Sequence, residues 1–464
     1  MKLVKSLLLG SAAGLLAVTG SMAADLPSRK AAPVDYVRVC SAQGVGFFFI
    51  PGTENCLQIS GRVRADYLFG RNYSRADDNY GIRASARLNF DYRQATSIGT
   101  VRAYVRFNMG RSSGRTQFGY TGNGVRQTND GTNDRASLDL AFIQFGLGGG
   151  AVTAGRATSF FDFYGTDAYW NFGGISGTNG SAANLLAYTA NFGGGFSATL
   201  SIEDRGVSGL ALSGGAPADN VGAFPFGTSN LLYSGRQYPD LVGVLRLQQG
   251  WGTAQLMGAV RDVRTDNATA TLLSTGRASR TGFAIGAGAS FNLPMLGAGS
   301  GLYLEGVYTR GMTNYTSGDS ATRIGYANLA VADYAYNAAN GTARLTESYS
   351  LVAALRLQYT PQLRQHIFAG YTSVSYGTLG NAPAGAAVVL PALTSTAGLR
   401  SFTKFEIGTN FLYTIAPGLN LGVEVVYQAI DPRGSFAYNT AGNQARTAGS
   451  QSAVEGRLRI QRDF

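Results

Sequence analysis

The residues that could do chemistry gather in residues 155–183 and in the segments on either side. Two acids, Asp162 and Asp167, stand in this stretch, while the flanking segments are rich in arginine. Carboxylates set opposite guanidinium groups create a local electric field, which orients charged or dipolar molecules without making or breaking a bond. The chemistry that these residue types indicate is therefore electrostatic rather than covalent.

The same stretch is too apolar for a solvent-exposed loop and too irregular for a strand. Its aromatic residues follow neither the period of a strand nor that of a helix. They are Phe160, Phe161, Phe163, Tyr164, Tyr169, Trp170 and Phe172. We interpret the stretch as a loop folded into the lumen of a β-barrel, with its aromatics against the wall and its acids facing wall arginines across water. The alternative is an ordinary surface loop with a hydrophobic cluster.

Covalent catalysis has little support in the sequence. The single histidine, His366, follows a proline turn at the start of a predicted strand, which favours a place at the rim. We find no acid pair, metal-binding cluster or phosphate loop, since Gly-rich stretches such as Gly146–Gly150 lack the strand-to-helix context of a nucleotide site. We therefore expect no enzyme activity, no cofactor and no metal.

The N-terminus indicates export. Lys2 and Lys5 precede an apolar run, and small residues end at Ala23 and Ala24, which is typical of a secretory signal peptide over residues 1–23. Its removal lowers the formal charge from +11 to +9, because two lysines leave with it. Residues 24–56 are expected to form a periplasmic lead. Later segments fall short of the roughly 18 consecutive apolar residues that a membrane helix needs.

The two cysteines, Cys40 and Cys56, bracket a short apolar stretch. In an oxidising periplasm such a pair is expected to form a disulfide. A metal site is the competing interpretation, and it is poor because the chain offers no further cysteine and one histidine.

Alternation of apolar and polar residues predicts strands with two unlike faces. In residues 57–69 the odd positions are apolar and most even positions are polar, and residues 82–93 and 101–109 repeat this pattern. The polar faces carry Arg62, Arg64, Arg83, Arg87, Arg102 and Arg106. An arginine facing lipid at the bilayer midplane costs about 2–4 kcal/mol, so these side chains are expected to face the lumen. This placement favours a pore lining over nucleic-acid binding.

The whole chain from residue 57 to residue 464 is predicted to form an all-β transmembrane barrel of about sixteen antiparallel strands. Thirteen more strands follow the first three, with the phase slipping near Ala141 and unclear around Phe368, where a bulge or a lumen aromatic could explain it. Short and long connections alternate, as in outer-membrane barrels, and residues 157–184 form the third long loop. Most of the other long loops are expected to form an extracellular rim. The amphipathic last strand ends at Phe464, the usual signal for outer-membrane assembly.

Two stretches resemble a known family. Residues 25–67, with the spaced cysteines, resemble the start of the mature general porins of alphaproteobacteria, the rhizobial type. Residues 155–174 look like the constriction loop of trimeric porins, with Asn171, Phe172, Gly173 and Gly174 as the matching element. The resemblance implies a sixteen-stranded trimer with one pore per subunit and the third loop folded inward. By position, Asp162 and Asp167 would be the acids of the constriction and the six arginines the opposing cluster.

These observations predict a general diffusion porin of the Gram-negative outer membrane, open to small hydrophilic solutes and ions. A substrate-specific channel on the same barrel is the alternative, and an outer-membrane enzyme or adhesin is a weaker one. Expected partners are two further copies of the chain, outer-membrane lipid and lipopolysaccharide, and the assembly machinery. Apolar residues around Leu138–Leu147 and at the chain ends favour the trimer. The excess of arginine in the lumen favours anions or little selectivity, and the alternative is that the acids of the third loop dominate at the narrowest section.

Overall fold

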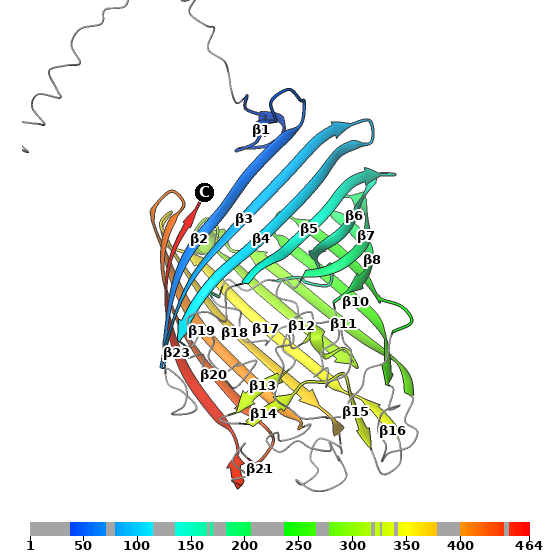
Figure 1. Cartoon of the computed structure of the whole chain (residues 1–464), viewed down its shortest axis with the longest axis vertical. Coiled ribbons are helices and arrows are strands. Elements are labelled where there is room, and N and C mark those ends of the chain that lie inside the picture. The colour runs from blue at the N-terminus through cyan, green and yellow to red at the C-terminus, as the bar shows by residue number, and fades with distance from the viewer. Residues whose placement is uncertain are drawn as a thin grey trace, which may run out of the picture.

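The computed structural model describes residues 38–70, 79–114, 135–164, 168–169, 182–205, 236–265, 278–316, 321–324, 327–337, 342–377, 400–439 and 445–464. Over these ranges the chain forms a closed antiparallel β-barrel (Figure 1). The expected signal peptide lies outside the described residues.

Sixteen strands within the described ranges make up the barrel wall, as the alternation of residues predicted. They are β2 (Cys56–Gly70), β3 (Tyr80–Thr96), β4 (Gly99–Gly114), β5 (Arg135–Leu147), β6 (Gly150–Thr158), β7 (Ala182–Gly193), β8 (Phe196–Asp204), β9 (Asp240–Gln249), β10 (Gly252–Thr265), β11 (Ala278–Asn292), β12 (Gly301–Arg310), β17 (Glu347–Gln358), β18 (Leu363–Ser375), β19 (Phe402–Ala416), β20 (Leu419–Asp431) and β23 (Gln451–Asp463). Each pairs with the next, and β23 pairs with both β20 and β2, which closes the ring.

Strand β2 illustrates how the two faces differ. Ile59, Val63 and Tyr67 are 48 %, 53 % and 40 % exposed and point outward, while Arg62 and Arg64 between them are half-buried and point inward. Since an apolar outer face meets lipid and a polar inner face meets water, this alternation suits a transmembrane wall.

The strands are joined by short turns at one end of the barrel and by long connections at the other. Gly148 and Gly149, with φ of 55° and 81°, form the two-residue turn between β5 and β6, and two positive φ values in succession match the twist of a hairpin. The C-terminus lies at this short-turn end, while the hairpin β21 (Phe436–Asn439) with β22 (Ala445–Ala448) lies at the opposite end (Figure 1).

A bulge in β5 explains the phase slip that the sequence showed near Ala141. Arg106 of β4 pairs with Leu140, but its neighbour Phe107 pairs with Leu138, so Asp139 is the extra residue. The bulge lets the Asp139 carboxylate lie 2.7 Å from Arg106 Nε. The second uncertain place, around Phe368, is a lumen aromatic: this ring is buried in a cluster inside the barrel.

Several short elements are not among the sixteen wall strands. A short strand, β1 (Phe48–Phe49), pairs with the start of β2, and the 3-10 helix η1 (Ser41–Gln43) precedes it. Cys40 and Cys56 form a disulfide that ties this segment to β2, which confirms the predicted pairing. Another 3-10 helix, η2 (Pro294–Leu296), lies between β11 and β12. The described residues include no helix long and apolar enough to span a membrane.

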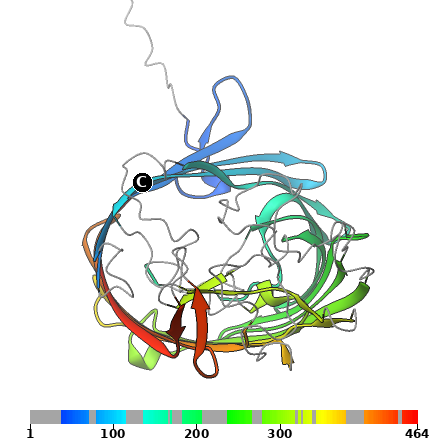
Figure 2. The ribbon, with the colours of Figure 1, turned by 60° about the horizontal axis from the view of Figure 1, so that its bottom comes forward.

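One long connection, between β12 and β17, contains several short elements. They are the 3-10 helix η3 (Thr313–Tyr315) and two hairpins, β13 (Ala321–Ile324) with β14 (Ala327–Ala330) and β15 (Tyr334–Asn337) with β16 (Thr342–Leu345). When the long-connection end is turned forward, segments in the yellow-green of this region lie within the outline of the barrel (Figure 2).

Candidate pore constriction

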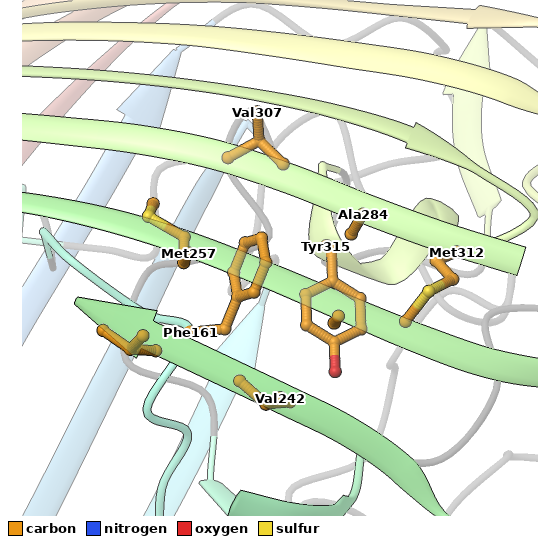
Figure 3. Close-up of a cluster of buried hydrophobic side chains, with 9 residues drawn as sticks. Phe161, Val242, Met257, Ala284, Val307, Met312 and Tyr315 are labelled. Carbon is orange, nitrogen blue, oxygen red and sulfur yellow. The ribbon is translucent and has the colours of Figure 1, made fainter. Parts of the chain in front are cut away.

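The described part of the third long loop leaves the end of β6 and runs along the inner face of the wall. The Phe160 N–H donates a hydrogen bond of 3.0 Å to Glu203 Oε1 at the end of β8. The next ring, Phe161, is fully buried among Val242, Met257 and Val307 of β9, β10 and β12 (Figure 3). The loop therefore begins against the wall and not in the solvent.

Two more aromatics continue along the wall. Phe163 lies over Gly288 of β11, where an added Cβ would come within 2.3 Å of its ring. Tyr164 stacks on Tyr303 of β12, with ring centroids 4.4 Å apart, and shares a buried cluster with Phe368 of β18. Glycine at position 288 thus leaves the space that the Phe163 ring occupies.

The last described loop residue, Tyr169, reaches the inner face of β20 and β23. Its N–H donates to Glu424 Oε2 at 2.7 Å, and Arg459 donates to its carbonyl oxygen. The ring lies over Gly422, and its hydroxyl donates to the Phe411 carbonyl oxygen. The described loop residues 160–164 and 168–169 contact strands from β8 round to β23, so these residues follow that half of the inner wall.

Asp162 is placed differently from the sequence-based expectation. Its carboxylate does not face the six arginines of β2 to β4 across water but forms a 3.0 Å ion pair with Arg205, just after β8, and both side chains are at most 4 % exposed. The loop carries Asp162 along the wall on the side of β8, which brings it to this nearer arginine. Burial disfavours the charge of Arg205, but Asp162, Tyr315 and Glu203 together outweigh this effect and raise the pKa of Arg205.

Other expected loop residues lie outside the described ranges: Asp167, Trp170, Phe172, Gly173 and Gly174.

The arginines of β2, β3 and β4 line the lumen on the side away from the described loop contacts. Arg83 forms an ion pair of 2.7 Å with Asp66, and Arg102 one of 2.9 Å with Asp91. Arg87 and Arg106 share Asp139, at 3.5 Å and 2.7 Å. These four side chains are between 21 % and 29 % exposed, so they remain in contact with the lumen.

Arg62 and Arg64 stand apart from the other four. In the described part of the chain neither is within ion-pair distance of a carboxylate, and Arg64 Nε donates to the amide oxygen of Gln461 on β23. Register places Arg62 directly opposite Arg87 of β3. This stretch of wall therefore carries net positive charge facing the lumen.

Two further arginines come from the last strand. Arg457 pairs with Glu424 at 3.0 Å and Glu455 at 2.8 Å, and Arg459 pairs with Asp66 at 2.6 Å. The strand was predicted from its alternation, but these two arginines were not among the residues expected at the constriction. The signal was available, because a closed barrel must pair its last strand with its first.

His366 was expected at the rim, but the structure places it elsewhere. It is 3 % exposed on the lumen face of β18, where its Nδ1 lies 3.0 Å from Asn410 Oδ1 and Arg356 Nε donates to its Nε2. Alternation along β18 turns its side chain inward, where polar neighbours satisfy it.

Comparison with known proteins agrees with this architecture. The sequence profile of the porin subfamily matches residues 25–457. Porin Omp2b from Brucella canis is 34 % identical over 255 residues, 54 % of this chain and 64 % of the relative. Porin Omp2b of Brucella abortus matches at the same identity and coverage. The alignment thus spans less than two thirds of the length of these relatives.

Among solved structures, the outer membrane channel DcaP of Acinetobacter baumannii has the same fold. It superposes with a TM-score of 0.60 at 15 % sequence identity, covering 90 % of this chain and 99 % of that channel.

A closed barrel with an apolar outer face and a charged, loop-narrowed lumen defines a multi-pass outer-membrane β-barrel protein. The chain belongs to the porin subfamily.

Proposed function

We propose that the protein is a general diffusion porin, a passive water-filled channel for small hydrophilic solutes and ions. One observation carries the proposal. The described loop residues 160–164 and 168–169 pack on one half of the inner wall, while the arginines of β2 to β4 line the other half and stay partly exposed. The free passage then lies between the loop and the arginine wall.

The mechanism needs no covalent chemistry and no energy input. A polar solute exchanges part of its hydration shell for charged and hydrogen-bonding groups of the wall, and its dipole aligns in their field. An apolar solute gains nothing from the same groups, so the exchange is unfavourable for it. We infer that solutes are selected by size and polarity.

The charge on the wall favours anions. Asp66, Asp91 and Asp139 each pair with two arginines and so neutralise only part of the arginine charge. Arg62 and Arg64 have no carboxylate partner in the part of the chain that the structure describes. Screening limits the reach of a charge to a Debye length of about 8 Å at physiological salt. Arginines at the passage therefore affect permeation more than charged residues on distant loops.

We further propose a homotrimer set in lipid and lipopolysaccharide. The outer face of β5 exposes Leu138, Ile143 and Leu147. Strands β23, β2, β3, β4 and β5 are consecutive neighbours in the wall. The two regions that the sequence analysis assigned to the interface are thus parts of one surface. Phe464, whose N–H donates to the Gly61 carbonyl oxygen at 3.1 Å, is proposed as the residue read during assembly.

Planar-bilayer recording and liposome swelling test the proposed function. Purified protein is expected to give stepwise conductance that rises linearly with salt concentration, and to admit small sugars faster than large ones. Conductance that saturates with one solute would favour the substrate-specific channel instead. Absence of any channel would contradict both.

A further inference from the structure

In the long connection between β12 and β17, residues 311–346, described residues from two parts of the connection fold into the barrel and not outward. Met312, Thr313 and Tyr315 are fully buried, and so are Val331 and Asp333 further along. Most of the long loops other than the third were expected to form an extracellular rim. Met312 and Tyr315 depart from that expectation, because they pack with buried residues of β9, β10 and β12.

A buried charge cluster holds this connection, residues 311–346, which we call the second loop because it is the second one to enter the barrel. Arg261 of β10 donates from Nε to Asp240 at 2.8 Å and from Nη1 to Asp333 at 3.1 Å, and all three side chains are fully buried. The N–H and the hydroxyl of Thr313 donate to the other oxygen of Asp333, at 2.8 Å and 2.7 Å. Charge-assisted hydrogen bonds of this kind fix geometry strongly. Asp333 therefore joins two parts of the second loop to the wall.

Tyr315 carries the contact from the second loop to the constriction loop. Its ring meets Phe161 edge-on, with centroids 4.6 Å apart (Figure 3). The Arg205 guanidinium, which pairs with Asp162, lies 4.5 Å from the centre of the same ring. The Tyr315 hydroxyl donates to Asp240 at 3.0 Å. Burial and the nearby Asp240 raise the pKa of Tyr315, so the hydroxyl keeps the proton that it donates.

We propose that Tyr315 is a positioning residue for the constriction loop, so that the second loop helps to set the width of the passage. Phe161 contacts the Tyr315 ring directly, and Asp162 pairs with Arg205, whose guanidinium lies over the same ring. The wall side of Phe161 is apolar, and the Tyr315 ring completes its enclosure. This inference rests on the proposed function and extends it to a residue more than a hundred positions away from the loop it orients.

Replacing Tyr315 tests the proposal in planar bilayers. Tyr315→Ala removes the ring, and the constriction loop is expected to leave the wall part of the time, giving a second conductance level. An edge-on aromatic pair shifts such an equilibrium by roughly 2- to 12-fold, which is the expected rise in occupancy of that level. Tyr315→Phe keeps both ring contacts and is expected to stay close to the parent.

A second variant acts on the same unit without touching either ring. Asp333→Asn keeps the size of the side chain but weakens its bond to Arg261, so it is expected to change conductance in the same direction as Tyr315→Ala. Glu347→Gln is the matched control, since Glu347 is a half-exposed carboxylate at the base of the same loop, 3.9 Å from Arg310. Heat-dependent mobility on gels confirms that each variant has folded.

The outcomes separate the two claims. Folded Tyr315→Ala and Asp333→Asn channels with the conductance levels of the parent would overturn the role of Tyr315 and leave the porin function standing. A parent protein that forms no channel would instead contradict the proposed function.

Discussion

Asp66 of β2 and Arg459 of β23 form a 2.6 Å ion pair across the seam where the barrel closes. Both side chains are at most 5 % exposed. Because Arg459 also donates to the Tyr169 carbonyl oxygen, the seam and the far end of the described loop share one network. Barrel closure and loop position are thus linked through one guanidinium group.

Asp66→Asn is expected to destabilise the barrel. The substitution leaves Arg459 without its carboxylate, and breaking a buried pair costs about 3 kcal/mol or more. Urea unfolding in detergent micelles measures the loss. Asp431→Asn, at an exposed end of β20, is the control and is expected to unfold like the parent. Equal midpoints for both variants would show that the seam pair contributes nothing.

Gly288→Ala is expected to push the constriction loop into the passage. Its Cβ would lie 2.3 Å from the Phe163 ring, so the ring must move away from the wall and towards the lumen. Single-channel conductance is expected to fall. Gly243→Ala serves as the control because its Cβ would meet nothing within 4 Å. A conductance for Gly288→Ala equal to that of Gly243→Ala would mean that the loop does not border the passage.

The Cys40–Cys56 bridge is expected to protect the segment before β2 without supporting the barrel. It closes a loop across a sequence separation of 16, for which about 3 kcal/mol is the chain-entropy value. A Cys40→Ser and Cys56→Ser double variant is expected to keep its channel activity, while limited proteolysis cuts residues 38–55 faster. Free thiols found by mass spectrometry in protein isolated from outer membranes would refute the bridge.

The trimer is checked by gel mobility. The apolar outer faces of β2 and β5 are expected to give a detergent-resistant, heat-sensitive trimer. A monodisperse monomer in mild detergent would argue against this interface.

Much of the fold was predictable from the sequence, because alternation along a strand is a local property. The strict pattern around Arg62 and Arg64 predicted both the strand and the inward direction of its arginines. The partners of the loop were not predictable. Asp162 meets Arg205, and Phe161 meets Tyr315, because loop residues fold back against the inner wall, and no local pattern in the sequence marks these contacts. The second loop was missed for a related reason: its buried residues are scattered among small and polar ones, so no periodic pattern marks them.

The most direct test of the passage between loop and arginine wall is the reversal potential in a salt gradient across a planar bilayer, measured for the parent and for Arg62→Gln with Arg64→Gln. Both side chains face the lumen without a carboxylate partner in the described part of the chain, so removing their charge changes the local field most. The parent is expected to prefer anions, and the double variant is expected to shift towards cations. An unchanged reversal potential would contradict the account, because ions would then pass elsewhere.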